Sequence, residues 1–250
     1  MIDFAFDFTG RHALITGGTR GVGLAIAEAF MGAGAIVSVT GTKILPSLYD
    51  ADLSRFRYSQ LQLASSDAID SFLDRLDDVD VVVNCAGAKL PGGLDQHERE
   101  LISHSARLGL VGPARLVTRM RYRLTKSKIP GGGAVINTSA ARRWLELTQS
   151  ATDAQAELAS QTRRLGDTWA RHGARVNTVI ESLPVAVPSQ LRVQISHHSG
   201  PLLTRSSSAP ARTGSINDVA SVVLFLASSG AAAITGQTFQ VNTGGLAAAH

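Results

Sequence analysis

The residues near the amino end that are best suited to chemistry form a glycine-rich turn, Thr16-Gly17-Gly18-Thr19-Arg20-Gly21-Val22-Gly23. This turn follows the apolar run 13–15 and precedes the helix-like segment 24–30. Glycines permit a tight turn and a close approach of the backbone to a pyrophosphate, and a following helix presents free N–H groups and the positive end of its dipole to that anion. The order strand, glycine turn, helix therefore predicts a phosphate cradle, the alternative being an ordinary glycine-rich turn.

The segments that must position this turn alternate between strand-like and helix-like patterns. Such alternation predicts an α/β fold, a single-domain Rossmann-type doubly wound parallel sheet with helices on both faces. Ligands of such sheets bind beyond the carboxyl ends of the strands. We expect strands at 13–15, 35–40, 61–63, 80–87, 134–139, 175–180 and 238–241, and helices at 24–30, 67–76, 98–108, 113–124, 152–172 and 219–227.

Length and composition favour one domain. The 250 residues have 44% hydrophobic content and no internal linker, so a single core over residues 1–250 is expected. The 24 basic and 20 acidic residues are spread along the chain, and the resulting net charge of +4 does not indicate nucleic-acid binding. The densest basic run, 115–128, is expected to solvate one end of a helix.

Cysteine content and hydropathy predict a cytoplasmic protein. Cys85 is the only cysteine, which excludes an internal disulfide and fits a reducing compartment. The chain has no apolar run long enough to span a membrane, and residues 1–7 do not have the pattern of a signal peptide. One thiol and the absence of His-x₃-His spacing indicate no metal site.

Four motifs, in order along the whole chain, resemble those of the short-chain dehydrogenase/reductase family. Thr16-Gly17-x-x-x-Gly21-x-Gly23 is similar to the family's nucleotide-binding turn, and Val83-Asn84-Cys85-Ala86-Gly87 to its V-N-N-A-G turn with one Asn replaced. Gly133-Ala134-Val135-Ile136-Asn137-Thr138-Ser139 resembles the strand that ends in the catalytic Ser. The family's C-terminal part is matched by Arg212-Thr213-Gly214, Asp218-Val219-Ala220, Phe225-Leu226-Ala227-Ser228, Ile234-Thr235-Gly236-Gln237 and Gly244-Gly245.

The resemblance implies a seven-stranded sheet, a nicotinamide cofactor, a small-molecule ligand, a substrate lid at about 183–210, and a homodimer or homotetramer. No nucleic acid or membrane is implied as a partner. The cofactor residues that it implies are Gly17, Thr19, Arg20, Gly21, Val22, Gly23, Thr40, Thr42, Asn84, Ala86 and Gly87.

The end of the second strand bears on the choice of cofactor. A carboxylate there would bind a ribose diol and repel a 2′-phosphate, but the place falls on Gly41. With Arg20 in the glycine turn and Lys43 nearby, NADP(H) is favoured over NAD(H), the alternative being that both cations are merely solvated. Family contacts to the adenine and the nicotinamide are replaced by Ala64 and Ala186, so weakened or lost cofactor binding is expected.

The chain departs from the family at the groups that move protons. Ser139 remains, but the Tyr-x-x-x-Lys pair falls on Ala151 and Gln155, or on Thr152 and Ala156 when counted forward from Ser139. No tyrosine follows Tyr122 and no lysine follows Lys128, so no alignment restores the pair. The family's Asn falls on Gly109. General acid catalysis contributes about 10²–10⁴ in rate, so ordinary carbonyl reduction is expected to be very weak or absent.

Glu181 is the candidate replacement. It lies at the carboxyl end of the sixth strand, which neighbours the fifth strand in this fold, so its backbone is expected close to that of Ser139. If the carboxyl is enclosed there, burial would raise its pKa and let it act as an acid or base. In the alternative interpretation the side chain points outward or pairs with Arg142 or Arg143.

Three functions remain open on the sequence. The first is an enzyme repurposed for a non-redox or atypical reaction on a small carbonyl-containing metabolite. The second is a non-catalytic pseudoenzyme that serves as a regulatory or structural subunit. The third is an atypical NADPH-dependent reductase that uses an unforeseen proton donor.

Overall fold

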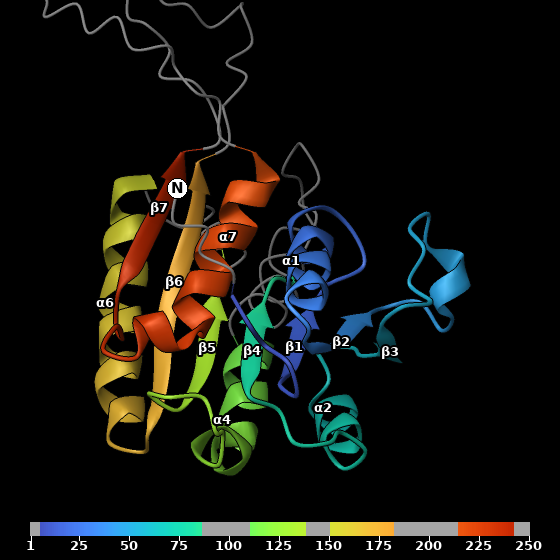
Figure 1. Cartoon of the computed structure of the whole chain (residues 1–250), viewed down its shortest axis with the longest axis horizontal. Coiled ribbons are helices and arrows are strands. Elements are labelled where there is room, and N and C mark those ends of the chain that lie inside the picture. Colours follow the sequence, from blue (N-terminus) through green and yellow to red (C-terminus); the bar gives the residue numbers. More distant parts are fainter. Residues whose placement is uncertain (1–5, 87–110, 139–150, 183–214, 243–250) are drawn as a thin grey trace, which may run out of the picture.

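The computed structural model describes residues 6–86, 111–138, 151–182 and 215–242 of the chain (Figure 1). Seven strands form one sheet in the order β3-β2-β1-β4-β5-β6-β7, and every pairing is parallel. The strands are β1 (His12–Thr16), β2 (Ile36–Gly41), β3 (Arg57–Gln60), β4 (Val81–Asn84), β5 (Gly133–Asn137), β6 (Ala174–Ser182) and β7 (Thr238–Asn242). The order reverses between β1 and β4, and ligands of open α/β sheets bind at such a switch point.

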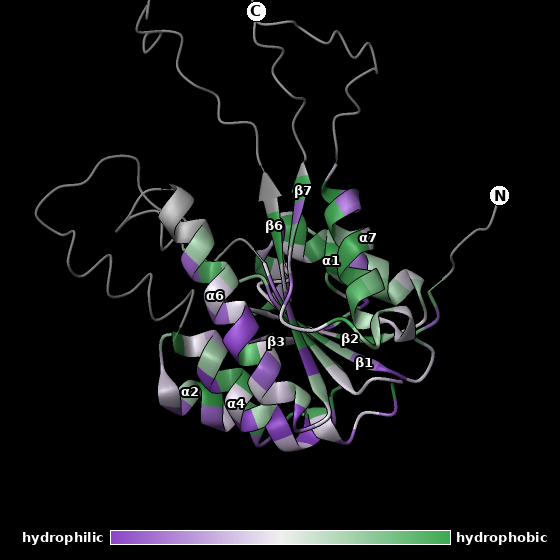
Figure 2. Cartoon of the chain, turned by 90° about the vertical axis from the view of Figure 1, so that its left-hand side faces the viewer, coloured by the Kyte–Doolittle hydropathy of each residue, from purple (hydrophilic) through white to green (hydrophobic). Residues whose placement is uncertain are grey.

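Helices cover both faces of the sheet, as the sequence predicts. Figure 2 shows α1 and α7 on one face and α2, α4 and α6 on the other. The helices are α1 (Gly21–Gly32), α2 (Ser66–Leu73), α4 (Gly112–Thr125), α6 (Ala151–Ala170) and α7 (Ile216–Ala227), with short 3-10 turns η1 (Pro46–Leu48) and η4 (Ser229–Ala231). Each face has its own buried apolar cluster, because successive side chains of a strand point to opposite faces. This is the predicted doubly wound Rossmann-type fold.

Local signals explain where several helices begin. Ser65 precedes α2, and its hydroxyl accepts a hydrogen bond from Ala68 N at 3.2 Å. Ser215 and Asp218 form a capping box at the start of α7. Pro113 occupies the first turn of α4, where its missing N–H costs no hydrogen bond.

The third strand lies in a different place from the prediction. The sequence favours 61–63, whereas β3 is Arg57–Gln60. Leu61 and Leu63 are buried, but they follow the strand and pack under α2 from the connecting loop. At the sheet edge β3 needs no continuous apolar run, which is why its pattern gives no signal. The helix expected at 98–108 lies outside the described residues.

The long helix α6 packs closely against the turn before β7. A Cβ added at Gly166 would overlap the backbone of Gly236. Gly236 N donates a hydrogen bond to Val176 O at 2.7 Å, and Val176 N donates to Thr235 Oγ1 at 3.1 Å. Helix α6, the start of β6 and the turn at 234–237 therefore form one tightly packed unit.

Candidate functional site

The glycine turn has a shape that side chains would prevent. Gly17 has a φ of 68°, a left-handed conformation that glycine adopts at no steric cost. A Cβ there would lie 2.8 Å from Ala86 Cα, and a Cβ at Gly23 would overlap the Gly17 carbonyl oxygen. Gly17 is therefore packed closely against both the first turn of α1 and the chain after β4, beside the switch point of the sheet.

The start of α1 has no side-chain cap. Arg20 is the N-cap residue, its side chain makes no capping hydrogen bond, and the first turn of the helix has no acidic residue. The first N–H groups of a helix have no partner within the helix, and together with the dipole they attract an anion. The amino end of α1 therefore has the features that favour binding of an anion. Arg20 is exposed beside it, and Thr19 is buried.

A row of polar side chains crosses the whole sheet, at the carboxyl ends of the strands from β3 to β5, in the middle of β6 and at the first residue of β7. In each strand the residue of this row is paired in register with that of the next strand. Residues that share a register row project from the same face of the sheet, so the row forms one polar band. Its members, in sheet order, are Ser59, Thr40, Thr16, Asn84, Asn137, Thr178 and Thr238.

Hydrogen bonds within the band fix the chain at the switch point. Thr16 Oγ1 accepts from Cys85 N at 3.2 Å and from Ala86 N at 3.3 Å, which holds the segment after β4 against the glycine turn. Asn84 Nδ2 donates to Asn137 Oδ1 at 2.9 Å. Asn84 Oδ1 is buried and accepts no hydrogen bond from the residues that the structure describes.

Aromatic residues surround the end of β2. Gly41 is buried, and the Tyr49 phenol lies directly against it. Lys43 N donates to Tyr49 Oη at 3.0 Å, and the Tyr58 hydroxyl donates to Lys43 O. Burial and then the neighbouring Tyr49 phenol raise the pKa of Tyr58 well above its ordinary value, which keeps it a donor.

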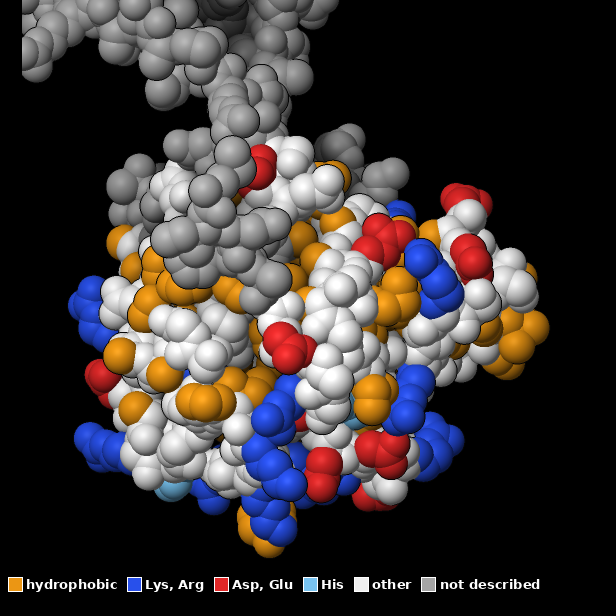
Figure 3. Space-filling view, in the orientation of Figure 1, with side chains coloured by type: hydrophobic (Ala, Val, Ile, Leu, Met, Phe, Trp, Pro, Cys, Tyr) orange, Lys and Arg blue, Asp and Glu red, His pale blue; other side chains and the backbone are white. Residues whose placement is uncertain are grey.

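The connection between β2 and β3, residues 42–56, holds Lys43 and Tyr49; it projects from the β3 side of the sheet and carries η1 (Figure 1). Figure 3 shows hydrophobic side chains on this projection. They include Ile44, Leu45 and Leu48, which are 70%, 54% and 51% exposed.

The cofactor residues predicted from the sequence lie together as far as the structure describes them. Residues 17–23 form the turn, and Thr40, Asn84 and Ala86 lie at the carboxyl edge beside it. Thr42 is exposed just past β2. Gly87 lies outside the described residues. The sequence did not single out Tyr49, which lies against Gly41 but belongs to no periodic pattern, or Asn137, which the strand register places beside Asn84.

The predicted catalytic residues are placed only in part. Ser139 and Gly109 lie outside the described residues, as do Ala186 and the predicted lid at 183–210. Ala151 is the first residue of α6, and Gln155 follows one turn later in the same helix. Glu181 belongs to β6, and its backbone pairs with Val241 of β7.

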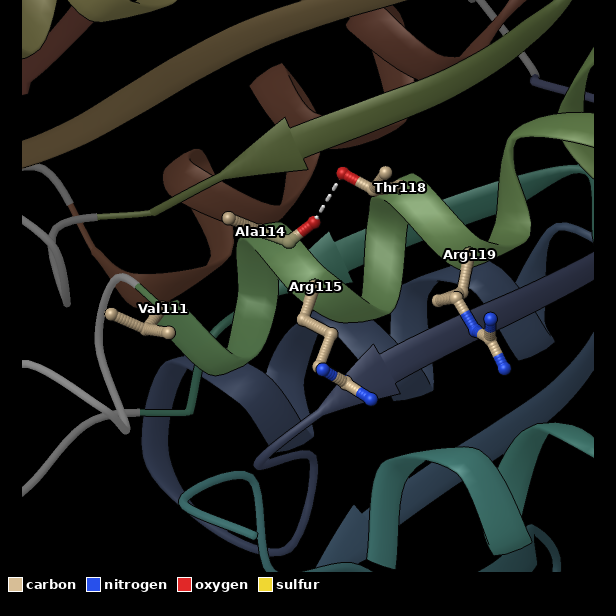
Figure 4. A pocket seen from close by; sticks show the side chains of 5 residues that line it. All are labelled: Val111, Ala114, Arg115, Thr118 and Arg119. Atoms are coloured by element: carbon tan, nitrogen blue, oxygen red, sulfur yellow. Dashed lines mark hydrogen bonds between the residues drawn. The ribbon is translucent and has the colours of Figure 1, made fainter. Parts of the chain in front are cut away.

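The described part of the chain also has a surface groove of about 580 Å³ along α4, lined by Val111, Ala114, Arg115, Thr118 and Arg119 (Figure 4). Arg115 and Arg119 both pair with Asp70 of α2, at 2.7 and 3.3 Å. The groove contains no residue of the glycine turn or of the polar band, so it is distinct from the predicted phosphate site. These arginines of the basic run serve the contact between α2 and α4.

The described residues contain neither a candidate metal site nor a candidate membrane span. No cluster of three or more His, Cys, Asp or Glu side chains among them is arranged to hold a metal ion. None of the described helices is both long and apolar enough to cross a bilayer.

Comparisons with known proteins agree with the fold. A family model described as enoyl-(acyl carrier protein) reductase matches residues 17–245. A 2,3-dihydroxy-2,3-dihydro-p-cumate dehydrogenase of Pseudomonas putida is 29% identical over 261 residues, covering 96% of each chain. Nodulation protein G of Rhizobium meliloti is 30% identical over 255 residues, covering 96% of this chain and 98% of the relative.

Solved structures show the same architecture. A short-chain dehydrogenase/reductase family protein superposes with a TM-score of 0.71 at 27% identity, covering 96% of this chain and 98% of its own. The family model spans most of the chain, and the parallel sheet, the glycine turn and the relatives all agree with it. The chain therefore belongs to the short-chain dehydrogenase/reductase family, whose members named here include dehydrogenases.

Proposed function

We propose that this protein binds NADP(H) at the glycine turn but has lost the standard hydride-transfer machinery of its family. The observation that carries the cofactor half is the close fit of Gly17 against Ala86 beside the uncapped start of α1. Close backbone packing around an open helix N-terminus is what a pyrophosphate requires. Arg20 and Lys43, with glycine at position 41, favour NADP(H) over NAD(H).

The catalytic half of the proposal rests on α6. Leu158, Thr162 and Trp169 are buried, whereas Ala156 is exposed. Positions 151 and 155 precede Thr162 by about three and two helical turns, so they share its sheet-facing side by helical period. This favours Ala151 and Gln155 over Thr152 and Ala156 as the places of the lost Tyr and Lys. Neither Ala151 nor Gln155 has a side-chain group that passes a proton to a substrate oxygen at neutral pH.

The chemistry we propose instead is a non-redox or atypical reaction on a small carbonyl-containing metabolite. Ser139 would orient the substrate oxygen, and Glu181 would give or take the proton. The backbone of Glu181 pairs with Val241 of β7. Thr178 is the last residue of β6 that pairs with β5, so Glu181 lies past the end of β5. This position supports the role, because Ser139 also follows the end of β5. We extend the proposal to a lid at 183–210 and to a cytoplasmic homodimer or homotetramer, as the family resemblance implies.

Calorimetric titration of the purified chain with NADPH tests the cofactor half. We expect saturable binding, tighter for NADPH than for NADH. Heat signals indistinguishable from dilution up to millimolar NADPH would overturn the proposal.

Restoring the missing pair tests the catalytic half. The double substitution Ala151→Tyr with Gln155→Lys is expected to raise NADPH-dependent reduction of a broad panel of small ketones by at least about tenfold, because general acid catalysis contributes about 10²–10⁴. Thr152→Tyr with Ala156→Lys is the matched control, since it adds the same groups one position away. Equal activity of both doubles, or ordinary reductase activity in the unaltered chain, would contradict the proposal.

A further inference from the structure

The connection between β2 and β3 brings a tyrosine to the place of the missing β2 carboxylate. A Cβ built on Gly41 would overlap the Tyr49 hydroxyl and would lie 2.8 Å from Thr19 Cγ2 of the glycine turn. The Tyr49 hydroxyl therefore occupies the position from which a side chain at residue 41 would start. Three elements meet at this point: the end of β2, the glycine turn and the segment after η1.

Tyr49 is held in this position from several sides. Its N–H donates to Pro46 O at 3.1 Å, which closes the turn η1, and its hydroxyl accepts from Lys43 N. Lys43 Nζ lies 4.8 Å from the centre of the ring, and the Tyr58 ring lies 5.9 Å away. These contacts fix the phenol at the end of the strand.

The location matters because of what a dinucleotide presents there. In Rossmann-type folds the pyrophosphate lies on the glycine turn, and a carboxylate at the end of the second strand hydrogen-bonds the ribose 2′-hydroxyl. A side chain that fills the space of that carboxylate is therefore within reach of the same ribose. A phenol hydroxyl donates and accepts hydrogen bonds, but it is far less acidic than a carboxyl group and does not repel a 2′-phosphate in the same way.

We propose that Tyr49 is a specificity-determining residue that replaces the missing β2 carboxylate, its hydroxyl binding the 2′ position of the adenosine ribose in either its free or its phosphorylated form. Gly41 is required because only a residue without a side chain admits the phenol. The inference rests on the proposed binding of a nicotinamide dinucleotide and names the residue that recognises its adenosine end.

Three ligands separate this role from general effects on the turn. NADPH and 2′,5′-ADP carry the phosphorylated ribose, whereas inorganic pyrophosphate meets only the glycine turn. In Tyr49→Phe, which keeps the ring, we expect calorimetry to show at least fivefold weaker binding of NADPH and 2′,5′-ADP and unchanged binding of pyrophosphate. Tyr58→Phe is the matched control, because it removes the phenol hydroxyl of the adjoining strand β3, which donates to Lys43 O, whereas the atoms nearest to a Cβ at Gly41 belong to Tyr49 and Thr19.

Two further variants test the geometry itself. Gly41→Ala must displace the Tyr49 hydroxyl, so it is expected to weaken NADPH binding as Tyr49→Phe does. Gly41→Asp combined with Tyr49→Ala exchanges the phenol for a carboxylate and is expected to shift the ratio of NADH to NADPH affinity at least tenfold toward NADH.

The outcomes distinguish this inference from the function on which it rests. Unchanged NADPH binding in Tyr49→Phe, or equal weakening in Tyr58→Phe, would overturn the role of Tyr49 and leave the proposed cofactor site standing. Failure of the unaltered chain to bind NADPH would overturn both.

Discussion

At the scale of single residues, two glycines of the glycine turn have similar backbones and different surroundings. Gly17 and Gly21 have φ angles of 68° and 54°, so a side chain would be strained at either place. A Cβ at Gly17 would meet Ala86 Cα at 2.8 Å, whereas a Cβ at Gly21 would have no atom within 4 Å. The pair therefore separates the effect of backbone conformation from that of close packing.

Alanine substitutions at these two positions are expected to differ in cost. Gly21→Ala should lower the free energy of unfolding by about 1 kcal/mol through backbone strain alone. Gly17→Ala should cost about 1–3 kcal/mol more, because the segment after β4 must move, and it should weaken NADPH binding at least tenfold. Urea denaturation and calorimetry give both quantities. Equal costs would mean that Ala86 yields freely and that the close approach is not a requirement of the site.

At the scale of elements, one buried arginine joins β6 to the end of α7. Arg175 is 3% exposed, and its guanidinium donates to four backbone oxygens, those of Leu226, Ala227, Ser228 and Ala231. The last carbonyls of a helix have no partner within the helix, and a cation at that end also favours the dipole. Burial lowers the pKa of Arg175 to about 10, so it still carries its charge at neutral pH.

Replacing this arginine is expected to loosen the packing of α7 on the sheet. Arg175→Met keeps an unbranched side chain but leaves buried carbonyl oxygens without donors, which should lower the free energy of unfolding by about 2–4 kcal/mol. Arg171→Met is the control, because Arg171 is exposed just after α6 and a surface substitution stays within about 0.5 kcal/mol. Similar unfolding curves for both variants would show that water satisfies the α7 carbonyls.

At the scale of the whole molecule, the two edges of the sheet have different chemistry. The carboxyl ends of β1, β4 and β5 carry part of the polar band, whereas the amino end of β1 carries a buried histidine. His12 Nδ1 lies 2.7 Å from Asp78 O, and Nε2 lies 2.8 Å from Ser38 Oγ. A carbonyl oxygen only accepts, so Nδ1 carries the proton and the neutral ring accepts from Ser38. Burial, and to a smaller extent Arg57, lowers the pKa of His12 against the opposite effects of Asp77, Asp78 and Asp80.

The lowered pKa makes the stability of the molecule depend on pH. The unfolded chain takes up a proton at the ordinary histidine pKa near 6.5, and the folded chain does so only at lower pH. The contribution of His12 is therefore complete above about pH 6.5 and is lost as the pH falls toward the folded-state pKa, by at most about 1.4 kcal/mol per pH unit. Urea unfolding at pH 7.5, 6.5 and 5.5 should show a shallower decline in His12→Gln than in the unaltered chain. His172→Gln, at an exposed histidine, should decline like the unaltered chain; if His12→Gln does so too, the assignment is wrong.

The strand positions predicted from the sequence are confirmed where burial on both faces of the sheet requires a continuous apolar run. Strands β1, β4 and β5 lie between helices on both faces, so their apolar runs predict them to within a few residues. The edge strand β3 was placed wrongly, because Leu61 and Leu63 enter the core from a loop and imitate a strand. A run of apolar residues indicates burial, and buried residues belong to strands reliably only in the interior of the sheet.

The sequence was sufficient to predict only those parts of the candidate site that consecutive residues form. The glycine turn is contiguous, so its spacing and flanking pattern were sufficient. The contact of Tyr49 with Gly41 depends on the path of a connection that has only a 3-10 turn, and no periodicity encodes that path. The polar band depends on the register of seven strands, which follows from pairing between distant segments.

The close contact between Gly166 and Gly236 has a consequence for the order in which the chain is completed. A ribosome releases α6 well before β7, yet the helix reaches its final distance from the sheet only when the turn at 234–237 is available to pack beneath it. Domains generally fold as units. The glycine turn leads into α1, which packs against α7 on the other face of the sheet, so this face also needs the carboxyl-terminal part of the chain. Both layers of helices therefore reach their final packing only when α7 and β7 join the sheet.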